Sequence, residues 1–232
     1  MELSDRMKAY EKSADGVLMP RTPVMIRVDG RCFHTYCKRF QHPYDLRIHE
    51  ALCEAAKSAM QSIMGAEIAF IQSDEISIFV KNYRTFESEN WFAGRTQKIA
   101  SVTASIVTAA FNSEILKVVD GALSPVSNAT FDARVFNVPT EDVGNYFVWR
   151  SRDAIKNAIS MFASSQLSHK ELMNVTTKER LEIISEIPAW QAAPLWFKYG
   201  TCRTPSLWWE TPLTVGSEVM KKILEIVDER EE

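Results

Sequence analysis

Hydrophobic and polar residues follow two different periods along the chain, and these periods predict strands and helices in a regular order. Strands are expected at 23–29, across 67–80 as a strand–turn–strand, and at 130–138. Continuous apolar runs are typical of strands covered on both faces, and alternation is typical of strands with one face in the core. Apolar residues recur at helical spacing through 45–64 and 94–116. The predicted order is strand–helix–strand–strand–helix–strand.

This order is that of the split βαβ, ferredoxin-like arrangement. We therefore expect an α+β fold in which residues 1–140 form a palm-like antiparallel sheet with the helices on one face and the other face open. Residues 141–232 are expected to be a helical extension that completes the same unit. Within it, Trp196–Thr201 and Leu207–Glu210 are predicted to pair as a short β-hairpin near 195–210.

Composition narrows the class of protein only moderately. The 232 residues are 46% hydrophobic and 25% charged, with 27 basic and 30 acidic residues, as is ordinary for a globular protein. A nucleic-acid partner would have to be bound by local arginine and lysine clusters or by a surface built from several subunits. The four cysteines lack metal-binding spacing and are expected to be free thiols, which favours a cytoplasmic location. No signal peptide is evident, and the apolar windows look too short and interrupted to span a membrane.

Acidic residues occur where two predicted strands end. Asp29 and Gly30 follow the first strand, and the tip of the 67–80 hairpin reads Ser73-Asp74-Glu75. Asp-Gly is common in structural turns, but Asn-Gly or Asp-Gly would suit the hairpin tip better than three polar residues that include two carboxylates. We therefore predict that Asp29, Asp74 and Glu75 are catalytic and that two Mg²⁺ ions bind beside a nucleoside triphosphate.

Several basic residues are candidate phosphate ligands, although each is also compatible with a solvated surface charge. They are Arg27, Arg95, Lys98, Arg134, Arg150 and Arg152. Arg150 and Arg152 are two residues apart and point apart on a helix, so only one of them would serve a given site. Arg95 and Lys98 lie one turn apart at the start of a predicted helix, so both can point to the same place.

Three segments carry a resemblance to a known family. They are IRVDGRCFH at 26–34, QSDEIS at 72–77 and FVWRSRDAIKN at 147–157. Together, in this order and spacing, they resemble the tRNA(His) guanylyltransferase family over residues 5 to 210. Membership implies 3′-to-5′ addition of nucleotides to the 5′ end of a tRNA, after ATP or GTP activates the 5′ phosphate. The resemblance also implies a homotetramer.

The resemblance assigns roles by position. Asp29, the Gly30 carbonyl and Asp74 match metal ligands, and Glu75 matches a second acidic residue that ligates or supports. Asn157 and Lys170 match residues that place a second triphosphate or the tRNA end, a role for which Arg134 and Arg150 are also candidates. The nucleotide contacts it implies are Arg27, Asp29, Gly30, Arg31, Cys32, Phe33, His34, Ser73, Asp74, Arg95 and Lys98.

One segment departs from the eukaryotic pattern. Eukaryotic members carry HINNLYN where this chain has FASSQLSHKEL at 162–172. The chain is more similar here to the guanylyltransferase-like proteins of bacteria and archaea, which favour templated repair of 5′-truncated tRNAs. Two other functions remain open at this point: a palm-domain nucleotide cyclase that acts on free GTP, and a non-catalytic nucleotide- or RNA-binding module.

Overall fold

The computed structural model describes residues 2–118 and 128–229 and contains a six-stranded antiparallel sheet of order β4-β1-β3-β2-β5-β6. The predicted loop at 120–125 lies outside these residues. The predicted mixed fold with an antiparallel sheet is confirmed, and its elements follow the predicted order. The strands are β1 (Val24–Gly30), β2 (Ala66–Gln72), β3 (Glu75–Val80), β4 (Phe131–Asn137), β5 (Thr201–Arg203) and β6 (Trp208–Trp209).

One face of the sheet packs on α3 (Leu46–Ser62) and α4 (Thr96–Val118). Side chains of β1 alternate between the faces, so that Val24, Ile26 and Val28 all join this core. Helix α3 begins where the Asp45 side chain accepts a hydrogen bond from the Arg47 amide, which satisfies an amide that the helix leaves free.

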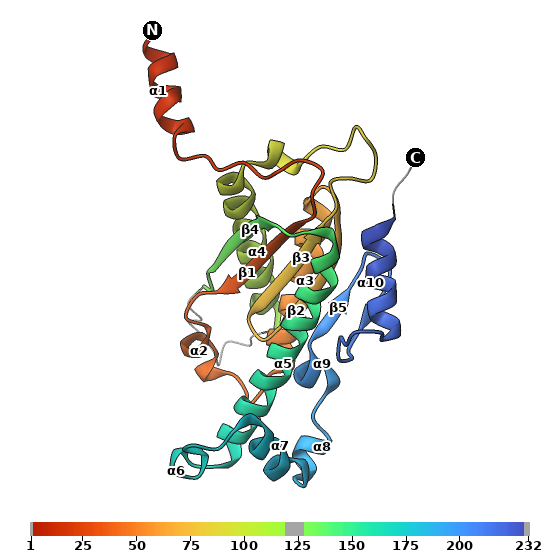
Figure 1. Ribbon diagram of the computed structural model, residues 1–232. Helices are drawn as coiled ribbons and strands as arrows, with labels where there is room; N and C mark the ends of the chain where they lie inside the picture. The colour runs from red at the N-terminus through yellow and green to blue at the C-terminus, as the bar shows by residue number, and fades with distance from the viewer. Residues whose placement is uncertain (1, 119–127, 230–232) are drawn as a thin grey trace.

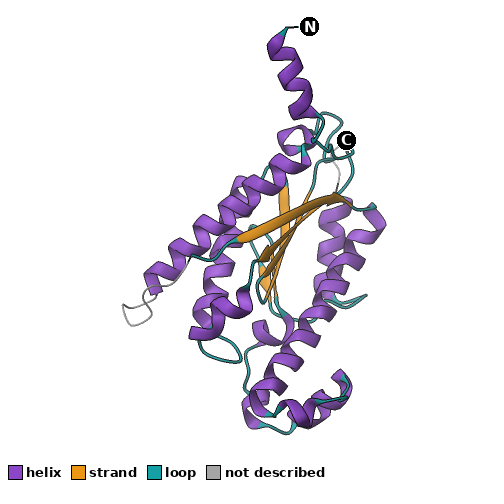
Figure 2. Cartoon of the chain, turned by 90° about the vertical axis from the view of Figure 1, so that its left-hand side faces the viewer, coloured by secondary structure: helices purple, strands orange, loops and turns teal. Residues whose placement is uncertain are grey.

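The helices α3 and α4 share one face of the sheet as predicted, but the opposite face is covered as well, so the prediction that it is open is wrong. Figure 2 shows the sheet between two layers of helices. Helices α5 (Val143–Gln166) and α10 (Glu218–Asp228) supply this second layer, and Phe147 and Ile223 pack with Met25 and Phe79 from the sheet. Because α5 begins just after β4, the C-terminal part of the chain returns across the face predicted to be open (Figure 1).

Helix α4 corrects a second expectation. By length and composition it could cross a membrane, since it has 23 residues and an 18-residue window with a mean hydropathy of 1.4. Its buried side chains, however, are part of the core that the sheet and α3 share; they include Ile99, Val107, Phe111 and Ile115. The fold thus explains the apolar residues at these core positions, whereas 28% of the apolar window as a whole is buried.

The predicted hairpin near 195–210 differs from the observed one. Residues Leu195–Tyr199 form a short helix, α9, and the strand begins only at Thr201. Gly200 separates them with a φ of +76°, and a Cβ there would lie 2.6 Å from the Phe70 ring. Strand β5 pairs with β2, so the hairpin extends the central sheet.

The remaining helices lie at the two ends of the molecule. Helix α1 (Leu3–Lys12) projects from the body (Figure 1) and buries none of its side chains. A separate apolar cluster joins the C-terminal half of α5 to the short helices that follow it. Those short helices are α6 (His169–Leu172), α7 (Thr177–Ser185) and α8 (Pro188–Gln191). Helix α2 (Phe33–Tyr36) lies elsewhere in the chain, directly after β1.

Candidate active site

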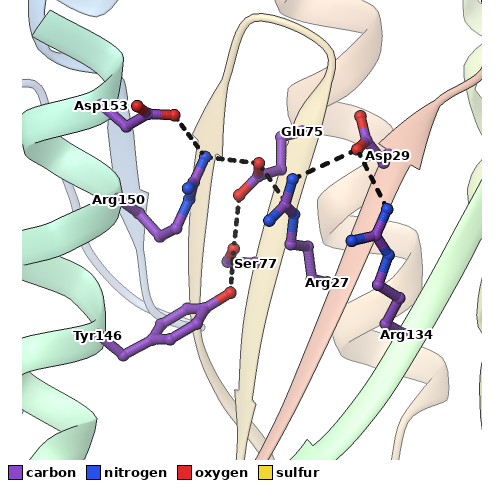
Figure 3. Close-up of polar contacts among 8 residues, drawn as sticks. All are labelled: Arg27, Asp29, Glu75, Ser77, Arg134, Tyr146, Arg150 and Asp153. Atoms are coloured by element: carbon purple, nitrogen blue, oxygen red, sulfur yellow. Dashed lines mark hydrogen bonds and ion pairs between the residues drawn. The ribbon is translucent and has the colours of Figure 1, made fainter. Parts of the chain in front are cut away.

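The ends of β1 and β3 bring polar side chains together on the face of the sheet that α5 covers. Asp29 and Glu75 are directly opposite each other in the antiparallel register, as are Arg27 and Ser77. Because strand residues two apart point the same way, Arg27 and Asp29 share the face of Met25, which packs under α5. Figure 3 shows these side chains converging between β1, β3 and α5.

Asp74 occupies the tight turn between β2 and β3. Its carbonyl accepts a hydrogen bond of 3.0 Å from the Gly30 amide, which ties the end of β1 to the hairpin tip. Burial, and next the negative charge of Asp29, raise the pKa of Asp74 to about 6. The hydrogen bond from Gly30 and the pairing of Asp29 with Glu75 place the backbones of Asp29 and Asp74 at the same end of the sheet. The turn places Ser73 at a φ of +54°, uncommon for serine.

Glu75 has a different environment from Asp74. Only 7% of it is exposed, and its Oε2 lies 2.7 Å from Arg150 Nη2 and 3.0 Å from Arg27 Nε. Its Oε1 accepts a 3.0 Å hydrogen bond from Ser77, whose hydroxyl lies 3.1 Å from that of Tyr146. Burial raises the pKa of Glu75, and the two guanidinium groups oppose that rise.

A chain of charges continues from Glu75 to Asp29. Arg27 Nη2 lies 3.4 Å from Asp29 Oδ2, and Arg134 Nη2 lies 4.0 Å from the same oxygen. On the other side, Arg150 also contacts Asp153 Oδ2 at 3.0 Å, one helical turn along α5. The sheet and α5 are therefore joined by a continuous polar network (Figure 3).

The donor set at the end of β1 fits Mg²⁺. Asp29 and Asp74 offer carboxylates from two joined strand ends, and Mg²⁺ is commonly held by one or two carboxylates while substrate phosphates complete its coordination. Within residues 2–118 and 128–229, no three histidine, cysteine or acidic side chains are grouped to hold a metal. Any ion here would thus share its ligands with a bound triphosphate. Gly30 is required at this position because a Cβ would lie 2.3 Å from Phe33.

A pocket of about 830 Å³ opens beside Asp74. Its polar side includes Ser73, Asp74 and His34, and the C-terminal half of α5 forms another wall. Its aromatic lining includes Trp196, which stacks on His49 with the rings 4.2 Å apart and nearly parallel. Pockets of this size and apolar character accept small organic ligands.

The structure brings together many of the residues singled out in the sequence. At the ends of β1 and β3 lie Arg27, Asp29, Gly30, Ser73, Asp74, Glu75, Arg134 and Arg150. In the segment after β1, Arg31 and Cys32 are exposed, whereas Phe33 is buried against Phe111 and Phe131. Asn157 is half-buried one turn beyond Asp153 on α5, and Lys170 is exposed on α6.

Arg95 and Lys98 are not brought to this site within the chain. The start of α4 is bound to Gly16 and Val17, whereas the Asp29 end of the sheet reaches α4 at Thr108, through the Phe131 amide. Thirteen residues of helix correspond to about 20 Å. Arg95 instead pairs with Asp15 at 2.8 Å, and Lys98 lies 4.4 Å from the centre of the Phe92 ring.

Sequence reasoning missed Ser77, Tyr146 and Asp153. A weak signal existed for two of them: Ser77 is the polar residue in an otherwise apolar strand two positions after Glu75, and Asp153 follows Arg150 by one helical turn. Nothing comparable distinguishes Tyr146 from the core aromatic residues of α5.

Comparison with known proteins agrees with this geometry. A model of the tRNA(His) guanylyltransferase family matches residues 4–139. A bacterial tRNA(His) guanylyltransferase-like protein in complex with ATP is 36% identical, with a TM-score of 0.90 over 98% of this chain and 100% of the other. A bacterial tRNA(His) guanylyltransferase-like protein in complex with GTP is 35% identical, with a TM-score of 0.80 over 98% of this chain and 100% of the other.

The match to a fungal relative spans a smaller share of that relative's length. The tRNA(His) guanylyltransferase of Schizosaccharomyces pombe is 32% identical over 63% of this chain and 54% of the relative. The chain therefore spans about half the length of that enzyme. Because the family model covers more than half of the chain and includes both carboxylate-bearing strand ends, the chain belongs to the tRNA(His) guanylyltransferase family.

Proposed function

We propose that this protein is an Mg²⁺-dependent nucleotidyltransferase that adds nucleotides in the 3′-to-5′ direction to the 5′ end of tRNA. The observation that supports it most strongly is the hydrogen bond from Gly30 to Asp74, which joins the strand ends that carry Asp29 and Asp74, with Asp74 lining an aromatic pocket, in a chain of this family. The proposal includes guanylate addition to tRNA(His) and templated repair of truncated 5′ ends, with ATP or GTP activating the 5′ phosphate. The two nucleotide complexes of bacterial guanylyltransferase-like proteins support ATP and GTP as ligands.

In this proposal Asp29, Asp74 and the Gly30 carbonyl hold two Mg²⁺ ions. When bound, these ions lower the pKa of the attacking hydroxyl and stabilise the charge of the triphosphate and its leaving group. Ser73 and residues 29–34 line the nucleotide, and the pocket beside Asp74 receives the base. Arg27 and Arg134 lie beside Asp29 and are the cations best placed for its phosphates.

The sheet and its two neighbouring helices are proposed to act as a ferredoxin-like palm over residues 1–140. Residues 141–232 are proposed to complete the same catalytic unit, because α5 covers the sheet and delivers Arg150 to Glu75. Asn157 and Lys170, further along, are proposed to place the second triphosphate or the tRNA end.

A homotetramer in the cytoplasm is proposed as the working form. The chain has 27 basic and 30 acidic residues, so a surface gathered from several copies is better suited to hold the tRNA backbone than one copy alone. Arg95 and Lys98 lie about 20 Å along α4 from the level of their own site. Their proposed phosphate contacts would therefore serve the substrate of a neighbouring copy.

The test is incorporation of labelled GTP into a 5′-truncated tRNA with a 5′-monophosphate. Asp29→Asn and Asp74→Asn should each lower the rate by at least about 100-fold, the usual effect of losing charge stabilisation at a reacting centre. Glu87→Gln, which alters an exposed loop carboxylate, is the matched control. Near-normal activity in either aspartate variant would refute the assignment, and GTP turnover without RNA would instead indicate a cyclase.

A further inference from the structure

Both oxygens of the Glu75 carboxylate already contact protein partners. Its Oε2 faces two guanidinium groups, at 2.7 Å from Arg150 and 3.0 Å from Arg27, and its Oε1 accepts the Ser77 hydroxyl. A metal ion at Glu75 would have to displace cations from a side chain of which 7% is exposed. Removing one member of such a buried pair leaves an uncompensated charge, which is strongly unfavourable.

Arg27 is oriented from one end by this carboxylate. Its Nε lies 3.0 Å from Glu75 Oε2, at ion-pair distance and without a hydrogen bond, and its Nη2 lies 3.4 Å from Asp29 Oδ2. The guanidinium group is planar and rigid, so fixing its Nε side also fixes the direction of its Nη groups. Glu75 thereby determines that the positive end of Arg27 lies beside Asp29.

Arg150 is in turn fixed by α5. It is 4% exposed, bonds Asp153 Oδ2 at 3.0 Å, and its guanidinium carbon lies 4.5 Å from the centre of the Trp149 ring. A side chain held on three sides in this way is not available to a tRNA or a triphosphate. The Nη2 that binds Asp153 also donates to Glu75, 75 positions earlier in the chain, whereas the buried Nε has no hydrogen-bond partner.

We propose that Glu75 holds Arg27 rather than a metal ion, and that Arg150, anchored by Asp153, is the positioning residue that keeps Glu75 in place. The inference rests on the proposed function, because Arg27 is assigned there to the phosphates. It changes the role of Arg150 from a substrate ligand to a residue that acts through two others. It also gives Glu75 a supporting role, in contrast to Asp29 and Asp74.

Metal binding separates the two roles of the carboxylates. Binding of Mn²⁺ to the full chain can be measured without any turnover, from the electron paramagnetic resonance signal of free Mn²⁺. Glu75→Gln should keep the Mn²⁺ affinity within about threefold, whereas Asp29→Asn should lose at least about tenfold, as one oxygen ligand and one charge are removed. Equal losses in both variants would make Glu75 a ligand and overturn the inference. Retained affinity in Asp29→Asn would instead refute the proposed metal site.

A double variant of Arg27 and Arg150 tests whether Arg150 acts through Arg27. In calorimetric titrations with ATP and Mg²⁺, Arg27→Met should weaken binding by about 10-fold, typical of one lost charge-assisted contact. Arg150→Met should weaken it by a smaller factor, and the double variant should be no weaker than Arg27→Met alone. Arg150→Lys, which can still donate to Glu75, should restore part of the loss.

The control is Arg152→Met, since Arg152 is exposed on α5 and lies two residues from Arg150, on a different side of the helix. It should bind ATP as the unaltered protein does. If Arg150→Met fails to fold, Asp153→Asn loosens the same arginine from a half-exposed position and should give the same coupled, smaller loss. Losses from Arg27 and Arg150 that multiply in the double variant, or no loss from either, would overturn the inference.

Discussion

Ionised Asp74 should destabilise the folded protein when no divalent cation is present. Its pKa is raised to about 6 from an ordinary 3.8, first by burial and then by the charge of Asp29. An acid whose pKa is higher in the folded state than in the unfolded state binds its proton more tightly when folded. The folded protein therefore loses stability as the pH rises from about 4 to about 6, and the full cost is present above pH 6. Asp74→Asn removes that cost while keeping the size and turn preference of the side chain.

The magnitude follows from the shift. The interval from 3.8 to about 6 is roughly two pKa units, or about 3 kcal/mol at 1.36 kcal/mol per unit. Asp74 keeps some contact with solvent, so we expect Asp74→Asn to be more stable by about 1 to 3 kcal/mol at pH 8. The gain should fall to about half at pH 5 and become small near pH 4, close to the ordinary pKa of 3.8, below which Asp74 is protonated in both states.

Urea unfolding in EDTA at pH 5, 6, 7 and 8 measures this difference. Asp29→Asn provides an internal check, because removing its charge should reduce the gain from Asp74→Asn. Glu87→Gln, an exposed carboxylate in a loop, should show no comparable gain. A variant that is no more stable than the parent at pH 8, or a gain that does not shrink toward pH 5, would refute the reasoning.

Three further outcomes are expected. Gly30→Ala should lower the free energy of unfolding by about 2 kcal/mol or more, through overpacking against the Phe33 ring at 2.3 Å, and denaturant titration would show it. Lys81→Met should cost about 1 to 2 kcal/mol and speed hydrogen exchange in α10, because the buried ammonium donates at 2.7 Å to the Ile226 carbonyl at the end of that helix. Burial lowers the pKa of His49 to about 4, so the unfolded chain gains its proton first as the pH falls from 6.5 to 4; His49→Gln should abolish that part of the acid destabilisation in thermal melts at these pH values.

The sequence was sufficient for the elements whose periodicity is strong and local. Strands β1 to β4 and helices α3 and α4 were predicted within a few residues, because their apolar spacing reflects one packed face each. The helix at 195–199 was not predicted, although Pro194 precedes it and Gly200 follows it, and proline before and glycine after a segment are typical of helices. Its aromatic residues favoured a strand on propensity, but Phe197 is buried in the cluster below α5 as part of a helix.

Most side-chain contacts between segments distant in the sequence could not be predicted. The two carboxylates at strand ends were predictable, since antiparallel strands bring their ends together. The pairing of Glu75 with Arg150 was not, because an amphipathic helix shows that it has an apolar face without showing which surface it covers. For the same reason, the adjacency of Arg95 and Lys98 on α4 was correct but gave no information on which end of the sheet they would reach.

The balance of charge at the site links its stability to its chemistry. Six side chains alternate in sign along the network: Asp153, Arg150, Glu75, Arg27, Asp29 and Arg134. Their formal charges cancel, and Asp74 forms no ion pair with any residue that the structure describes, so it adds an uncompensated negative charge next to Asp29. The charge that destabilises the protein without a divalent cation is therefore the one that a bound cation would neutralise. Mg²⁺ should accordingly stabilise the parent protein more than Asp74→Asn in the same urea titrations. Equal stabilisation of both proteins would show that the bound cation does not neutralise the charge of Asp74.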